Sequence, residues 1–192
     1  MAPALSPEAQ KLRDALFLAA SRTYAEQYIE PFIRAQYKLD AAFEHHDAID
    51  PKTGERYEIK AAKVLTSRPK AALKLLARIL AEIKNTEFHR MVPYAERYNA
   101  RYCANIQNVK RDHFDFLICV LLFSDKVVVF QIAVGKINGA SVKGWSEKHG
   151  LYDQIGKSGQ FNINKNSIVH HESNYAKDAF TYEQLLERYE TL

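Results

Sequence analysis

The chain has 192 residues, of which 47% are hydrophobic and 26% are charged, and its net charge is +4. We expect one domain, residues 1–192, because a chain of this length buries a core without disulfides or structural metals. The composition is ordinary for a soluble globular protein, and the longest apolar run, Phe116–Phe123, is too short to span a bilayer. The first residues lack the features of a signal peptide, and free buried thiols are the simplest interpretation of Cys103 and Cys119, so we expect a cytoplasmic protein.

The positive charge is concentrated in the middle of the chain. Residues 60–113 contain twelve Lys or Arg and four Asp or Glu, whereas residues 1–59 and 114–192 are each slightly acidic. A basic centre of this kind favours contact with a polyanion, and nucleic acid is the first candidate. The alternative is an ordinary solvated basic helix face.

The N-terminal third predicts helices followed by a hairpin. Ser6 is suited to cap a helix, and Pro7 to occupy its first position. Apolar residues then recur at helical spacing towards Ile33, and Pro31 predicts a kink or a break in that pattern. Residues 43–62 change to strand character around a turn sequence.

The remainder of the chain alternates between the two kinds of pattern. Helices are expected from about residue 67 or 69 to 88, near Pro93–Tyr102, and after the capping-box motif of Thr181 and Gln184. Strands are expected at Phe114–Phe123, Val127–Ile132 and Phe161–Val169. Tyr94, Tyr98 and Tyr102 recur at i+4, which favours a packed stripe over a base-stacking surface. A strand-rich centre flanked by helices predicts an α/β fold.

The hairpin carries the most informative residues, in the sequence His46-Asp47-Ala48-Ile49-Asp50-Pro51-Lys52-Thr53-Gly54-Glu55-Arg56-Tyr57-Glu58-Ile59-Lys60. If residues 51–54 form the loop, Asp47 lies opposite Glu58. Opposed Cβ atoms are about 4.5–5.5 Å apart and like charges there are destabilising, so two carboxylates require a cation between them. Glu58 and Lys60 share one face because side chains alternate along a strand. Two carboxylates and one ammonium on one face suit Mg²⁺.

This arrangement predicts hydrolysis of a phosphodiester. A metal held by Asp47 and Glu58 would bind a phosphate oxygen and lower the pKa of a coordinated water. Lys60 could orient or deprotonate that water, or stabilise the developing negative charge, and the sequence leaves both roles open. A one-residue bulge would set Asp50 against Glu58, so Asp50 is an alternative ligand.

The tripeptide Glu-Ile-Lys occurs twice in the chain, so the tripeptide alone does not indicate an active site. The second copy, Glu82-Ile83-Lys84, lies in a predicted helix, where residues two apart point about 200° away from each other. It also lacks an opposed Asp. We interpret it as part of a solvated helix face, so the strand context and the opposed Asp47 distinguish the first copy.

A helix, an Asp, a turn, Glu-x-Lys on the next strand and further strands together resemble the PD-(D/E)xK nuclease superfamily. Within it, the chain is most similar to small Type II restriction endonucleases. The matching motif covers residues 47–60, and the remainder matches in architecture only. The family usually has Pro before its Asp, where this chain has His46. Members often carry an acidic residue in the first helix that supports the metal site, and Glu30 or Glu26 could match it.

The resemblance implies a restriction-endonuclease-like fold with a central mixed β-sheet flanked by helices. It implies catalytic Asp47, Glu58 and Lys60, a Mg²⁺ cofactor, a homodimer, and cleavage of double-stranded DNA at a short specific sequence. Two alternatives remain: a structure-specific or repair nuclease of the same superfamily, and a DNA-binding module without catalysis.

Basic and amide side chains are the candidates for contact with DNA. Basic side chains of the predicted helix could neutralise phosphates, as could Arg90, Arg97 and Arg101, and two amide-rich segments could read base edges. The candidates are Lys70, Lys74, Arg78, Asn105, Gln107, Asn108, Lys110, Gln160, Asn162, Asn164 and Lys165. Polar loops that satisfy their own backbone give the same pattern. A fainter likeness of residues 170–174 to ββα-metal nucleases lacks a matching upstream histidine.

Overall fold

The computed structural model describes residues 5–19, 23–42, 45–66, 90–148 and 158–192. Helix α1 (Pro7–Leu18) begins as predicted, with the Ser6 hydroxyl accepting the N–H of Ala9 at 3.2 Å. A π-helical segment, Thr23–Ile29, leads into α2 (Glu30–Tyr37), and Pro31 lies in the first turn of α2. The helix type changes next to Pro31, which cannot donate a backbone hydrogen bond. The predicted interruption is therefore confirmed.

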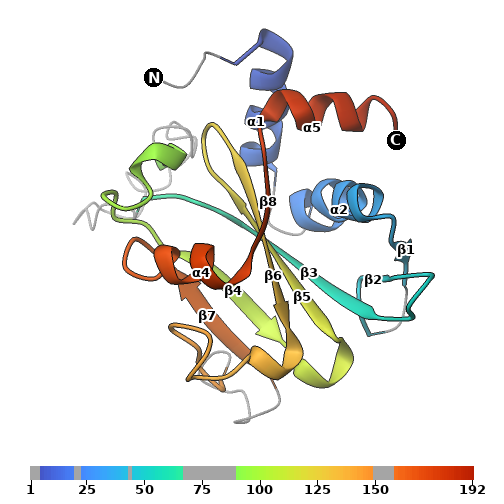
Figure 1. The fold of residues 1–192 in the computed structure, drawn as a ribbon. Coiled ribbons are helices and arrows are strands. Elements are labelled where there is room, and N and C mark those ends of the chain that lie inside the picture. Colours follow the sequence, from blue (N-terminus) through green and yellow to red (C-terminus); the bar gives the residue numbers. More distant parts are fainter. Residues whose placement is uncertain (1–4, 20–22, 43–44, 67–89, 149–157) are drawn as a thin grey trace, which may run out of the picture.

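Six strands form one sheet in the order β1-β2-β3-β5-β6-β8. They span Asp40–Ala41, Ala48–Ile49, Arg56–Lys63, Phe116–Leu122, Val127–Ala133 and Ala176–Phe180. Strands β3 and β5 are parallel, and the other neighbouring pairs are antiparallel. The predicted α/β class, with a mixed central sheet flanked by helices, is confirmed (Figure 1).

The sheet separates two buried clusters of side chains. Alternate residues of β5, such as Ile118 and Val120, pack with residues of α1, α2 and α5 (Tyr182–Tyr189). Their neighbours on the strand, such as Cys119, pack with a second sheet and with α4 (Ile168–Tyr175). The second sheet pairs β4 (Ala104–Val109) with β7 (Gly159–Ile163). The two layers lie on opposite sides of the central sheet in Figure 1.

Two predicted elements in the second half differ from the structure: one helix does not form, and one strand is shorter than predicted. Only a single 3₁₀ turn, Tyr94–Glu96, forms between Pro93 and Tyr102, because tertiary bonds tie this segment to the sheet. The Tyr94 N–H donates to Asp125 at 2.7 Å, and Tyr102 forms a β-bridge with Thr66.

The strand predicted at Phe161–Val169 ends at Ile163, and Val169 lies in helix α4. The side chain of Asn164 accepts the N–H of Asn166 at 2.9 Å, a local turn that ends the extended conformation. Strands β1, β4 and β8 were not predicted. Strand β1 is short and exposed, and in β4 and β8 polar or charged residues are interspersed among the apolar ones.

The C-terminal helix forms as predicted and is fastened to the sheet. Thr181 and Gln184 make the reciprocal bonds of a capping box. The next side chain, Tyr182, has no exposed surface, and its hydroxyl donates to the Phe123 carbonyl at 2.7 Å.

A Tyr182→Phe substitution is expected to lower the free energy of unfolding by about 1–2 kcal/mol, because the buried Phe123 carbonyl loses this donor. Urea denaturation measures the change. Tyr28→Phe is the matched control: Tyr28 is exposed, and its hydroxyl bonds to no residue that the structure describes. Equal effects of the two substitutions would contradict the prediction.

Candidate active site

The hairpin of β2 and β3 has the predicted register. Ala48 pairs with Tyr57 and Ile49 with Arg56, and no bulge interrupts the pairing. The side chain of Asp50 accepts the N–H of Lys52 at 2.8 Å and so stabilises the turn. This position in the turn removes Asp50 as a ligand candidate. The register continued by one residue sets Asp47 against Glu58.

The three predicted site residues lie together. The Asp47 carboxylate accepts the N–H of Ile59 at 2.7 Å, which fixes it at the end of the short strand β2. The Lys60 ammonium lies 3.8 Å from Asp47 Oδ2 and forms an ion pair with Glu58. Ile59 enters the core with 2% of its surface exposed, which leaves Glu58 and Lys60 on the opposite face of β3. Lys60 thus bridges the two carboxylates.

The electrostatics of this group follow from its burial. Burial raises the pKa of Glu58, the charge of Asp47 adds to this effect, and Lys60 opposes it. Burial alone would lower the pKa of Lys60, but the charges of Glu58 and Asp47 outweigh it and raise that pKa. Lys60 is therefore an ammonium at neutral pH in this arrangement, which favours an electrostatic role over that of a base.

A third carboxyl group, that of Glu30 at the start of α2, interacts electrostatically with Asp47 and Lys60. Burial raises the pKa of Glu30 to about 7, with a further contribution from Asp47 and opposing contributions from Lys60 and Arg34. Arg34 Nη1 lies 3.7 Å from Glu30 Oε2. The other candidate, Glu26, is exposed. Of these two acids, which lie in the π-helical segment and in α2 rather than in α1, Glu30 is therefore the better match to a supporting carboxylate.

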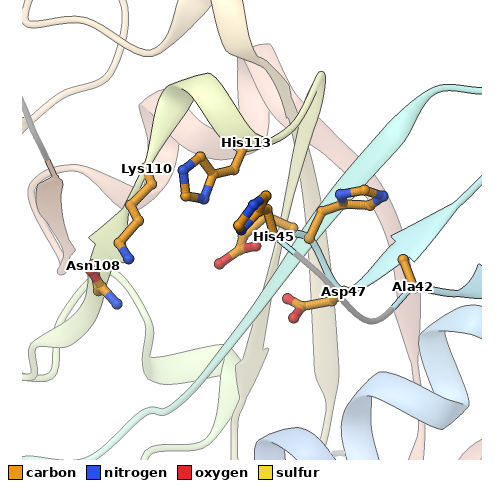
Figure 2. A pocket seen from close by; sticks show the side chains of 8 residues that line it. Ala42, His45, Asp47, Asn108, Lys110 and His113 are labelled. Carbon is orange, nitrogen blue, oxygen red and sulfur yellow. The ribbon is translucent and has the colours of Figure 1, made fainter.

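Asp47 and Glu58 face a pocket of about 300 Å³. Its lining comes from the segment before β2, from β3, and from the end of β4 with the turn that follows. Figure 2 shows most of these side chains, and the complete lining is Ala42, His45, His46, Asp47, Glu58, Asn108, Lys110 and His113. Carboxylates therefore share the pocket with imidazole, amide and ammonium groups.

From the sequence, His45 and His46 could assist the carboxylates, but Asn108, Lys110 and His113 were not expected at this pocket. Asn108 and Lys110 were expected to read bases, but they line the carboxylate pocket. The register between β4 and β7 shifts between Ile106 and Val109, and Asn108 adopts a left-handed backbone with φ 55°. Such a bulge re-aims the side chains around it. His113 carried no local signal, because only the pairing of distant strands brings it here.

The donor set at the pocket fits Mg²⁺. In the part of the chain that the structure describes, no group of three or more His, Cys, Asp or Glu side chains forms a metal-binding cluster. Mg²⁺ needs fewer protein ligands, since one or two carboxylates, water and substrate phosphates complete its coordination. Asp47 and Glu58 supply two such oxygen donors to one pocket.

The two amide-rich segments are brought together by β4 and β7. Asn105 lies opposite Asn162, and Gln107 and Gln160 lie further along the same antiparallel pair. The alternate residues of both strands enter the core, so these amides share the outer face. Asn164 instead stabilises the turn after β7. Lys165 is exposed in that turn, and Lys70, Lys74 and Arg78 lie outside the described residues.

Other sequence candidates have structural partners. The Arg97 guanidinium lies between the rings of Tyr94 and Tyr98, 3.8 and 4.0 Å from their centroids, and its Nε donates to Glu172 at 2.7 Å. Arg90 donates to the Thr66 carbonyl. These two arginines hold the fold together, while Arg101 is exposed. Of the tyrosine stripe, Tyr102 is buried, Tyr94 is half-buried and Tyr98 is exposed.

The segment that resembled ββα-metal nucleases is structural. His171 has no exposed surface and stacks on Phe161 with ring centroids 5.6 Å apart. His170 Nε2 lies 2.7 Å from the Ser141 carbonyl oxygen. The two cysteines are both free, but only Cys119 is buried as expected, and Cys103 is exposed.

No protein-family model matches the chain, and no curated protein matches it significantly. Among the helices that the structure describes, none has the length and apolar character needed to cross a membrane.

Proposed function

We propose that this chain is a Mg²⁺-dependent endonuclease with a restriction-endonuclease-like fold. It hydrolyses phosphodiester bonds of double-stranded DNA at a short specific sequence, as Type II restriction enzymes do. The observation that carries the proposal is the position of Lys60 between Asp47 and Glu58, beside a pocket that both carboxylates line. The sequence likeness of residues 47–60 to the PD-(D/E)xK motif supports it.

Each side chain has a chemical task in this proposal. The backbone N–H of Ile59 orients Asp47, and the Lys60 ammonium forms an ion pair with Glu58. Bound Mg²⁺ would polarise a phosphate oxygen and lower the pKa of a water. The Lys60 ammonium is then available to stabilise negative charge that develops on the phosphate, in a site where such charge is poorly solvated. Glu30 adds a third negative charge when ionised.

The test is incubation of supercoiled plasmid with Mg²⁺ and with EDTA. Discrete fragments that form with Mg²⁺ but not with EDTA support a restriction enzyme. A smear, or cleavage confined to branched substrates, supports a repair nuclease of the same superfamily. Binding that weakens with salt but without any cleavage supports a DNA-binding module. We also propose that the protein is a cytoplasmic homodimer. Sedimentation equilibrium would measure the mass of the particle and so test the dimer.

Base readout is assigned to the outer face of β4 and β7. Asn105→Ala and Asn162→Ala are each expected to reduce discrimination between the preferred site and a one-base variant by about 1–3 kcal/mol, because amides pair bidentately with adenine edges. Cleavage rates on the two duplexes measure the effect. Gln10→Ala, on an exposed position of α1 across the sheet, is the control. Equal weakening on every sequence would instead indicate phosphate contact.

A further inference from the structure

The pocket that contains Asp47 and Glu58 has a second wall of opposite character. Lys110 and Asn108 come from the end of β4, His113 from the turn that follows it, and His45 from the segment before β2. The rings of His45 and His113 have centroids 4.9 Å apart. Figure 2 shows Asn108, Lys110 and His113 across the pocket from Asp47, with His45 between them. We call these four residues the donor wall.

The polar side chains of the donor wall do not take part in the hydrogen bonds and ion pairs of the described fold. Within the described ranges, none of its four side chains makes a hydrogen bond or an ion pair with another residue. The neighbouring Arg111 shows the contrast, because its guanidinium donates to Glu147 at 2.6 Å and to the Ile137 carbonyl at 3.0 Å. The polar groups of the donor wall therefore remain available to a ligand.

The local backbone directs two of these side chains into the pocket. Asn108 has a φ of 55°, which residues other than glycine adopt infrequently, and it lies within the register shift of β4 against β7. A regular strand would continue the alternation that keeps Asn105 and Gln107 on the outer face. Unfavourable backbone conformations of this kind cluster at functional sites. The bulge separates Asn108 and Lys110 from the amides of the outer face.

We propose that the donor wall binds a phosphate group of the substrate and holds it against the carboxylates Asp47 and Glu58. An ammonium, an amide and two imidazoles can all donate to phosphate oxygens, and charge-assisted bonds of this type are the stronger ones. Without a ligand Lys60 forms the ion pairs with both carboxylates, whereas Lys110, among the described residues, forms no ion pair and acts on Glu58 only through its charge. That the phosphate belongs to DNA rests on the proposed function; the anion site itself does not.

The first experiment uses inorganic phosphate as the probe, in EDTA, with the histidine ring protons followed by NMR. We expect saturable shifts of the His45 and His113 signals, at least a tenfold weaker Kd in Lys110→Ala, and recovery in Lys110→Arg. Lys11→Ala is the control, since Lys11 is exposed on α1 across the sheet. A Kd that does not change in Lys110→Ala overturns the proposal. Histidine signals that respond to Zn²⁺ and not to phosphate overturn it in favour of a metal site.

The second experiment identifies the source of the phosphate. A short DNA duplex should displace inorganic phosphate from the wild-type chain, and Lys110→Ala should raise the KM for plasmid cleavage about tenfold with a smaller change in kcat. Phosphate binding that depends on Lys110, without any DNA cleavage, would support the anion site and contradict the proposed nuclease function. Cleavage with an unchanged KM and no phosphate binding would refute the donor wall alone. Thermal unfolding of each variant confirms that it is folded.

Discussion

A Lys60→Ala variant is expected to lose Mg²⁺-dependent DNA cleavage by about 10³-fold, the scale of removing one electrostatic group from a transition state. The Lys60 ammonium lies between Asp47 and Glu58, beside the pocket. Its removal takes away the positive charge that lies between the two carboxylates in the proposed mechanism. Single-turnover cleavage of plasmid measures the loss, and DNA binding in EDTA should change little.

The chain provides a matched control for this substitution. Lys84→Ala alters the same tripeptide, Glu-Ile-Lys, in its second copy, and should leave cleavage unchanged. Because Lys60 neutralises both carboxylates, its removal should also tighten Mg²⁺ binding, which calorimetry can follow. Full cleavage by Lys60→Ala, or equal losses in the two variants, would refute the site assignment.

The second large effect concerns stability against pH, and two buried groups contribute with opposite signs. Glu30 has a pKa of about 7 in the fold because of its burial, against an ordinary value of 4.5. Between these values the folded chain binds more protons than the unfolded chain, so stability falls as pH rises. The penalty is absent below pH 4.5 and complete above pH 7. A displacement of this size corresponds to at most about 3 kcal/mol.

His171 has the reverse dependence. Burial lowers its pKa to about 4 from 6.5, His170 adds to this effect, and the backbone of Lys143 opposes it only in part. Neither ring nitrogen of His171 has a hydrogen-bond partner of good geometry among the described residues. The unfolded chain binds more protons here, so stability is complete above pH 6.5 and is lost as pH falls to 4. The size is again at most about 3 kcal/mol.

The two dependences should largely cancel in the wild-type chain between pH 4.5 and 6.5. We expect His171→Leu to become less stable as pH rises through this window, and Glu30→Gln to become more stable. At pH 7 both variants should exceed the wild type, Glu30→Gln because no charge is buried and His171→Leu because an unpaired polar ring is removed. Urea titrations at several pH values provide the measurement. Parallel pH profiles of the two variants would contradict the assignment.

The hairpin could be predicted because its determinants are local. Loop length and strand alternation set the register of Ala48 with Tyr57, and hence the positions of Glu58 and Lys60. The donor wall could not be predicted, because Lys110 reaches the pocket through a bulge and through the pairing of β4 with β7.

Misplaced elements have a similar explanation. The spacing of Tyr94 and Tyr98 is helical, but Arg97 between their rings and its bond to Glu172 hold an irregular segment in place. Alternation stops at Ile163 in the sequence itself, because four polar residues follow, and a turn centred on Asn164 ends the strand there. At Tyr94 and Tyr98, interactions of one side chain override the periodic pattern.

The parallel pairing of β3 with β5 has a consequence for how the pocket is assembled during folding. Glu58 is paired with Leu117, a residue far along the chain, whereas Ala48 and Tyr57 are joined by a short turn. Contacts between distant residues form late, because closing a long loop reduces chain entropy before any contact compensates for it. The carboxylates can therefore come together early, but the cavity between the two walls exists only after the slowest pairing. A nascent chain should thus acquire its chemistry late, when β5 has paired with β3 and β7 with β4.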